Sequence, residues 1–359
     1  MTQSAPGEMS RILLDQADRL FQQHVTKEQL AEADAGTWPA AMWDAVEKAG
    51  LPLAMVAEEA GGVGLPAADA MRLVRRSAYH TLPLPLAETM LAAALWTQAG
   101  GAMVDGPMSL APTNSRDAIS IRRQGDGYVL AGEAHRVPWA TRVAHVLVLA
   151  RDATGAGHLV LLPRVARNVV ARRNLAFEPR ETLALDGTAI SPDAVRPAPD
   201  LGTEGVLPLG ALVRAQQMVG AMERCLDYSL AYANERKQFG RPIGKFQAVQ
   251  HMLADAAGQY AAAAAAADLA AEAFGTSGFA FAVAIAKARA GEAAGKVAEI
   301  AHQVHGAMGF TQEHPLHFAT RRLWSWRDEF GNEAEWNLAL GRLAAAAGAD
   351  RLWPDIVAA

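Results

Sequence analysis

Residues 235–247, ERKQFGRPIGKFQ, combine cations, an aromatic ring and turn residues directly after a long amphipathic helical pattern. A helix that ends in this sequence presents the guanidinium of Arg236 and the ring of Phe239 side by side at a turn. A guanidinium can hold a diphosphate and a ring can cover an adenine face, so the segment predicts a nucleotide-binding corner. The residues alone leave a second interpretation open, in which Arg236 and Lys237 complement the helix dipole and Phe239 packs in the core.

Residues 302–310, HQVHGAMGF, form a second candidate corner. Here a helical pattern runs out into small residues, which let a backbone approach a ligand closely, although a plain glycine-terminated helix has the same appearance. The histidines of this region have a spacing that zinc could use, but cysteine, HExxH and matched carboxylates are missing nearby. We therefore expect packing or capping histidines and no metal, at His302, His305, His314 and His317.

Composition and the remaining motifs favour small-molecule chemistry. The 359 residues are 51% hydrophobic and carry a formal charge of -5 with dispersed basic residues, which argues against a nucleic acid or an anionic membrane as partner. The single cysteine, Cys225, precludes an internal disulfide, and the polar start predicts a cytoplasmic, soluble protein. A P-loop, a strand-linked GxGxxG and a GxSxG are all missing.

Three regions that must position these residues differ in periodicity. Residues 8–101 have a helical pattern, with helices expected at 39–49 and 67–76, and residues 108–199 change to short β-branched runs between Gly, Asp and Pro. Four long helical patterns follow from Leu207, which is typical of an antiparallel bundle. The seven consecutive alanines at 261–267 indicate close helix packing.

This order, together with both corner motifs, FQAVQHMLADAA from Phe246, and WDAVEKAGL followed by EEAGGVGL at 43–65, resembles the acyl-CoA dehydrogenase family over essentially the whole chain. The resemblance implies an α+β, mostly α fold. Its expected domains are a helical domain at 1–107, a middle β domain at 108–205 and a C-terminal four-helix bundle at 206–359.

The resemblance also implies FAD as cofactor, acyl-CoA as substrate and an electron-transfer flavoprotein as acceptor. The family's FAD contacts across a dimer interface fall on Arg236, Gln238, Phe239, Gln303, Gly306 and Ala307, with Gly309 beyond and Asn332 in the last helical region. An alanine at 307 replaces one of the family's paired glycines. Because both corners would serve a neighbour's FAD, we expect a dimer or tetramer, possibly with a second dehydrogenase subunit.

The family's reaction is α,β-dehydrogenation of an acyl thioester, in which a carboxylate removes the α-proton while the β-hydrogen leaves as hydride to flavin N5. Counted without gaps, the usual glutamate falls on Phe330, beside Glu329. A family branch places its glutamate on the first bundle helix, and that position is Gly210, followed by Ala211 where a CoA-binding arginine often lies. A small shift of this segment relative to the family's sequence would bring Glu329, or in second place Glu333, into the position of the base. Glu329 is therefore the predicted base.

The β domain departs from the family where the flavin ring should lie. The family's Thr-Glu-Pro run becomes Leu110, Ala111 and Pro112, and the Trp-x-Thr strand end has Arg136 and Pro138 in place of Trp and Thr. Proline has no amide donor, and both hydroxyls are lost. Trp139 is expected either against the flavin ring or in the core.

Three hypotheses for function therefore remain open. The chain is an independent FAD-dependent acyl-CoA dehydrogenase that uses Glu329, a non-catalytic subunit that contributes FAD contacts to a partner dehydrogenase, or a structural relic without redox activity.

Overall fold

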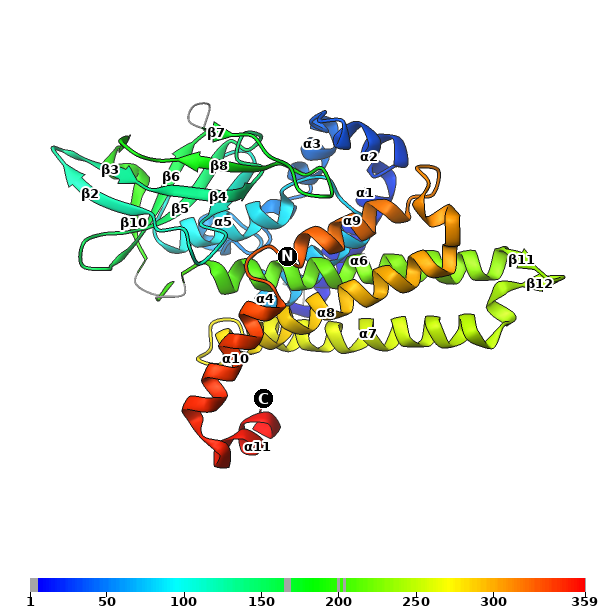
Figure 1. Ribbon diagram of the computed structural model, residues 1–359. Coiled ribbons are helices and arrows are strands. Elements are labelled where there is room, and N and C mark those ends of the chain that lie inside the picture. Colours follow the sequence, from blue (N-terminus) through cyan, green and yellow to red (C-terminus); the bar gives the residue numbers. More distant parts are fainter. Residues whose placement is uncertain (1–5, 165–168, 199–200, 203–204, 359) are drawn as a thin grey trace. The chain divides into compact units, whose positions relative to one another are not determined.

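The computed structural model describes residues 6–164, 169–198, 201–202 and 205–358 (Figure 1). The chain divides into two compact units, one formed by Met1–Ser77 with Leu82–Gly210, and the other by Ala78–Thr81 with Ala211–Ala359. The first unit contains the expected helical and β regions, and the second contains the bundle. Within the described residues, no helix is long and apolar enough to cross a membrane.

Helices open the first unit. Thr26 caps α2, where its hydroxyl accepts a hydrogen bond from the Gln29 amide at 3.3 Å. The last of these helices, α5, is buried along most of its length. It contacts the first strand through the Thr89 hydroxyl, which accepts a hydrogen bond from the Met108 amide at 2.9 Å. The helices are α1 (Pro6–His24), α2 (Lys27–Asp34), α3 (Ala40–Lys48), α4 (Ala67–Tyr79) and α5 (Leu86–Gln98).

The β region of the first unit forms two sheets. The larger has the order β10-β6-β5-β2-β3-β9, with β1 parallel to β5, and the smaller has the order β4-β8-β7. Apolar side chains of both sheets, such as Val148 and Leu183, share one buried cluster. The strands are β1 (Met108–Ala111), β2 (Ser120–Gln124), β3 (Gly127–Ala131), β4 (Glu133–Pro138), β5 (His145–Arg151), β6 (Gly157–Pro163), β7 (Val169–Val170), β8 (Arg180–Ala184), β9 (Thr188–Ile190) and β10 (Val195–Pro197).

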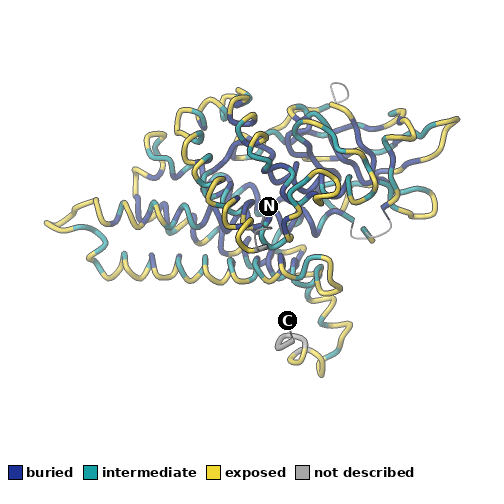
Figure 2. Tube along the Cα trace, turned by 180° about the vertical axis from the view of Figure 1, so that it is seen from behind, coloured by how far each residue is buried: buried dark blue, intermediate teal, exposed yellow. Residues whose placement is uncertain are grey.

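The second unit contains the long helices. Figure 1 shows α7 and α8 side by side, with the short β11–β12 hairpin at one end of α7, and Figure 2 shows that this hairpin is exposed. Buried alanines of the 261–267 run, Ala263 and Ala267, contribute to this packing. The elements are α6 (Leu207–Glu235), β11 (Lys237–Gln238), β12 (Arg241–Pro242), α7 (Gln247–Glu272), α8 (Phe279–His305), α9 (Leu316–Trp326), α10 (Glu333–Ala347) and α11 (Ala349–Ala358).

The fourth long helical pattern differs from expectation, because it is divided into α9, α10 and α11. Phe330 and Gly331 have φ angles of 54° and 87°, which a continuous right-handed helix cannot contain. Asn332 then starts α10 with a capping box, in which its side chain accepts from the Glu335 amide. The interruption lies at the residues where the family's base is expected.

Candidate functional site

The first corner is an exposed β-hairpin that begins where α6 ends. Lys237 pairs with Pro242 and Gln238 with Arg241, and the turn residues Phe239 and Gly240 have φ angles of 51° and 82°. Two successive positive φ angles give the type I′ turn that joins short antiparallel strands. Phe239 is 93% exposed, so the alternative in which it packs in the core is wrong.

Arg236, the last residue before β11, is exposed like Gln238. Phenylalanine is an unfavourable residue in the left-handed region, and such strain is common where a side chain must be held out for binding. The hairpin therefore presents a guanidinium, an amide and a ring to solvent, as the nucleotide-binding hypothesis requires.

The second corner is the 3-10 turn η6 (Gly306–Phe310), which follows directly from α8. Gln303, Gly306 and Ala307 are exposed. Gly306 has φ 57° and ψ -139°, and a Cβ placed on it would meet no atom within 4 Å. The space over Gly306 is open to a ligand.

Gly309 has a different reason to be glycine. It is buried, and a Cβ there would lie 3.0 Å from His305 Cβ and 3.2 Å from His302 Nδ1. The absence of a side chain thus allows the turn to fold back onto the two histidines. This packing explains the glycine at position 309 without a contact to a cofactor.

Both histidines pack inside the second unit. His302 Nε2 lies 3.0 Å from Thr320 Oγ1, and His305 Nδ1 donates to the Ala301 carbonyl at 2.7 Å. Burial lowers the pKa of each imidazole below its ordinary value. Among the residues that the structure describes, no group of three or more metal-ligating side chains is placed to hold an ion.

Glu329, the predicted base, is buried in an ion pair with Arg214 of α6. The Glu329 Oε2 atom lies 2.7 Å from Arg214 Nε, and the guanidinium also donates to Gln217 Oε1. Arg214 is fully buried, whereas Glu329 is 9% exposed. The Arg214 guanidinium also lies 5.5 Å from the centroid of the buried Phe330 ring. To act as a base, Glu329 would have to leave this guanidinium.

The backbone around Glu329 is fixed as well. Lys287 of α8 is fully buried, and its Nζ donates to the carbonyls of Arg327 and Gly331 at 2.7 and 2.6 Å. Burial lowers the pKa of Lys287 to about 7. The indole of Trp336 donates to the Phe330 carbonyl at 3.0 Å. Arg214 and Lys287 were not predicted, although each is a cation within an otherwise apolar helical stretch, the signal that could have identified them.

Asn332, predicted to contact the cofactor, has its side-chain oxygen engaged as the cap of α10, where it accepts from the Glu335 amide at 3.0 Å. Glu333, the other candidate base, forms an ion pair with Arg327 at 2.6 Å. Both residues therefore serve the start of α10 and the segment before it.

In the β domain, neither Leu110 nor Pro138 has a side-chain hydrogen-bond donor for a flavin edge. Leu110 is an apolar side chain buried on β1, and the Pro138 carbonyl accepts a hydrogen bond from the Ser109 hydroxyl. Trp139 lies in the core, packed edge-on against Trp38 with ring centroids 6.3 Å apart. Its contact with a flavin ring stays a prediction.

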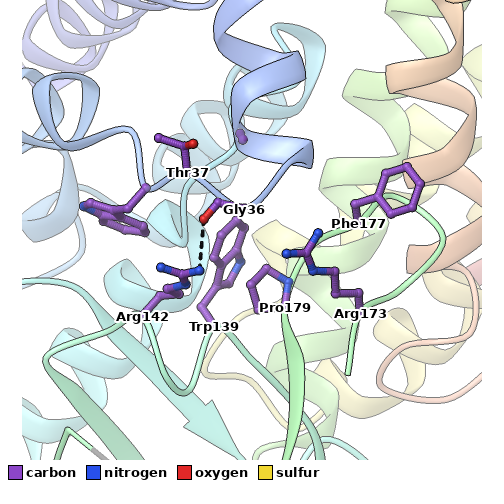
Figure 3. A pocket seen from close by; sticks show the side chains of 9 residues that line it. Gly36, Thr37, Trp139, Arg142, Arg173, Phe177 and Pro179 are labelled. Atoms are coloured by element: carbon purple, nitrogen blue, oxygen red, sulfur yellow. Dashed lines mark hydrogen bonds between the residues drawn. The ribbon is translucent and has the colours of Figure 1, made fainter. Parts of the chain in front are cut away.

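Trp139 also borders a small pocket of the first unit (Figure 3). Two arginines line this pocket, but each donates to a carbonyl at the end of α2: Arg142 to Gly36 and Arg173 to Asp34, both at 2.9 Å. These cations cap a helix terminus and are not arranged around a shared anion.

The residues predicted for the two halves of a FAD site thus differ in how well they fit the cofactor. The exposed Arg236 and Phe239 and the open backbone at Gly306 suit the phosphate and ring groups of a dinucleotide. Leu110 and Pro138, at the positions where the resemblance implies the flavin edge, lack the side-chain donors of the threonines that they replace.

Solved structures with this fold define the class of protein. The chain aligns with a variant of the Tcur3481-Tcur3483 steroid ACAD with a TM-score of 0.86 and 25% identity, over 96% of this chain and 99% of the other. The ChsE4-ChsE5 complex from Mycobacterium tuberculosis aligns with a TM-score of 0.84 and 22% identity, over 95% and 97% of the two chains. The expected α+β, mostly helical fold is thereby confirmed.

Sequence relatives identify the family. Residues 203–327 match the model described as Acyl-CoA dehydrogenase, C-terminal domain. Acyl-CoA dehydrogenase IpdE2 of Mycobacterium tuberculosis is 30% identical over 277 residues, which are 77% of this chain and 77% of that protein. The chain belongs to the acyl-CoA dehydrogenase family of oxidoreductases.

Proposed function

We propose that this chain is the base-lacking subunit of a heteromeric, FAD-dependent acyl-CoA dehydrogenase. In this role it contributes Arg236, Gln238, Phe239 and Gln303 to the FAD of its partner, while the partner supplies the carboxylate that removes the α-proton. The complex oxidises the Cα–Cβ bond of an acyl-CoA thioester, and an electron-transfer flavoprotein reoxidises it.

One observation supports this proposal above the others: the carboxylate nearest the expected base position is buried and paired. Glu329 Oε2 lies 2.7 Å from Arg214 Nε, and Phe330 fills the adjacent position. A guanidinium at hydrogen-bonding distance stabilises the carboxylate form, which makes it a poorer proton acceptor. Loss of a general base typically slows such a reaction about 10² to 10⁴-fold.

The remaining support comes from the unequal halves of the cofactor site. FAD, when bound, supplies the hydride acceptor for the β-hydrogen. The exposed Arg236 has the donor geometry to hold the diphosphate, and the strained Phe239 turn holds a ring beside it. Leu110 and Pro138 have no side-chain donor for the flavin edge, so the half of the site that fits FAD better is the half that this chain contributes to its partner. The two aligned proteins, the Tcur3481-Tcur3483 steroid ACAD and the ChsE4-ChsE5 complex, are each named as a pair of chains, which favours a heteromer.

The test is flavin retention with and without a second dehydrogenase subunit. We expect the chain to be colourless alone and yellow when coexpressed with its partner. Arg236→Ala should raise the FAD dissociation constant of the complex about 10- to 150-fold, because a hydrogen bond to a charged group contributes about 1.5–3 kcal/mol.

Arg241→Ala is the matched control, since Arg241 is an exposed guanidinium in the same hairpin that lies over the Phe246 ring. Its FAD affinity should equal that of the wild type. Yellow protein that oxidises acyl-CoA without a partner, and stops doing so on Glu329→Gln, would show instead that the chain is an independent enzyme. Absence of flavin from every assembly would favour the structural relic.

A further inference from the structure

The first corner is fixed to the last turn of α6. The Arg236 amide donates to the Tyr232 carbonyl, and the Ile243 amide, which follows the hairpin, donates to the Arg236 carbonyl, both at 2.8 Å. Gly244 lies close to α6, because a Cβ on this glycine would be 3.2 Å from the Ala233 carbonyl oxygen. The position of Arg236 therefore follows the end of α6, and Tyr232 in particular.

The second corner is fixed to the end of α8 in a similar way. His305 is the last residue of α8, and Gly306 begins the turn that follows it. Gly309 packs back against this residue, since a Cβ on the glycine would lie 3.0 Å from His305 Cβ. The His305 Nδ1 atom donates to the Ala301 carbonyl at 2.7 Å, which fixes the orientation of the imidazole. The position of Gly306 therefore follows His305.

The rings of Tyr232 and His305 connect the two corners. They are stacked, with centroids 4.6 Å apart and planes 27° apart. His305 is 2% exposed and Tyr232 is half-buried, and their sequence neighbours Val304 and Ala233 lie in one buried apolar cluster. The centroid of the His314 ring lies 4.5 Å from that of His305, so the imidazole is supported by a second ring. This stack joins α6 to α8 at the ends from which the corners project.

A ligand that contacts both corners requires a fixed distance between them. The proposed function assigns Arg236 and Gln303, which lie in different corners, to one FAD molecule. A stacked pair of partly buried rings has few alternative arrangements, so it sets the distance between the corners before the cofactor binds. A site that is ordered in advance loses less conformational entropy on binding.

We propose that Tyr232 and His305 are positioning residues, whose stacked rings hold the Arg236 corner and the Gln303 corner at the spacing that one dinucleotide needs. Neither ring has to touch the cofactor. This inference rests on the proposed function, because it requires that both corners bind the FAD of a partner subunit. A stacked aromatic pair has a modest interaction energy, so loss of either ring should weaken FAD binding about 2- to 10-fold.

The experiment measures the FAD dissociation constant of the complex with the partner subunit from flavin fluorescence. Tyr232→Leu and His305→Leu keep apolar volume but remove a ring, and each should weaken FAD binding by this factor. Tyr232→Phe and His305→Phe keep two stacked rings and should retain most of the wild-type affinity. Tyr260→Leu, at a half-buried tyrosine in the middle of α7, is the matched control and should bind FAD as the wild type does.

A second measurement separates positioning from a general loss of stability. With a fixed spacing, Gln303→Ala removes a contact that the wild type makes without further ordering. In a Tyr232→Leu background the two corners engage FAD together less often, so the same change should cost less affinity. A purely structural role would lower the melting temperature and leave the Gln303→Ala penalty equal in both backgrounds, and that result would overturn the proposal.

The outcomes also distinguish this inference from the proposed function. Wild-type FAD affinity in Tyr232→Leu and His305→Leu, together with weaker binding by Arg236→Ala, would contradict the positioning role while the proposed function stands. Wild-type affinity in Arg236→Ala as well would contradict both. The two leucine variants change different helices, so if one of them does not assemble, the other decides the question.

Discussion

At the scale of single residues, the informative feature is the buried pair of Arg214 and Glu329. Sequence comparison singles out Glu329 because it is the carboxylate next to the expected base position. The structure gives that carboxylate a partner on α6, and it gives the segment's backbone a second fixed point through Lys287. A carboxylate held in this way stabilises the end of α9 and the following turn, which accounts for its presence without a catalytic role.

Removal of one partner of this pair should be costly. We expect Glu329→Ala to lower the free energy of unfolding by about 3–5 kcal/mol, because it leaves a buried guanidinium without its counter-charge, and the double variant Arg214→Met with Glu329→Leu to recover much of the loss. Urea unfolding of the chain measures both effects. A Glu329→Ala protein as stable as the wild type would show that the pair does not hold this segment.

At the scale of elements, the two corners are ends of helices whose turns have different requirements. The β11–β12 turn exposes the Phe239 side chain to solvent, whereas η6 folds back so that Gly309 packs against His302 and His305. The second corner therefore depends on two imidazoles that burial keeps neutral. Its stability should follow their protonation.

Acid should destabilise this corner. Burial places the folded-state pKa of His302 and His305 below the ordinary value of 6.5, so the unfolded chain binds more protons as pH falls through 6.5. Stability is present above that pH and is lost below it, by at most about 1.4 kcal/mol per pH unit for each histidine. Thermal melts from pH 7.5 to 5 should show a smaller loss for His302→Phe, which cannot take up a proton, than for the wild type. Parallel pH profiles would contradict this assignment.

At the scale of the whole molecule, the proposed function gives the chain two unequal contributions to a cofactor site. The bundle end presents groups suited to another subunit's dinucleotide, and the β domain lacks the family's side-chain donors at Leu110 and Pro138, where its own flavin edge is expected. A pair of such chains alone would assemble two incomplete sites. One complete site requires a partner with an intact β domain.

This asymmetry predicts the flavin content of the complex. We expect one FAD per pair of unlike chains, measured from the absorbance of flavin released by denaturation and the protein concentration. Two FAD molecules per pair would mean that this chain's β domain also binds a flavin, contrary to the poor fit of Leu110 and Pro138.

Much of this description follows from the sequence, because its signals are local. The change from helical periodicity to short β-branched runs located the β region. The spacing of Arg236 and Phe239 after a helix indicated a candidate nucleotide-binding corner, although it left open whether Phe239 is exposed. Glycine at 306 and proline at 138 change the backbone wherever they occur, so their consequences could be stated from residue type.

Contacts between distant segments were decided only by the tertiary structure. Arg214 and Glu329 are 115 positions apart, and His302 and Thr320 lie on two different helices, so no period within one element relates the members of either pair. Their meeting depends on how α6, α8 and α9 pack. The sequence by itself therefore determined the family, most of the elements and which residue types could bind a nucleotide. Packing decided that Glu329 is paired, that Gly309 lies against the histidines and that Phe239 is exposed, because burial and contacts between distant residues arise only when the helices assemble.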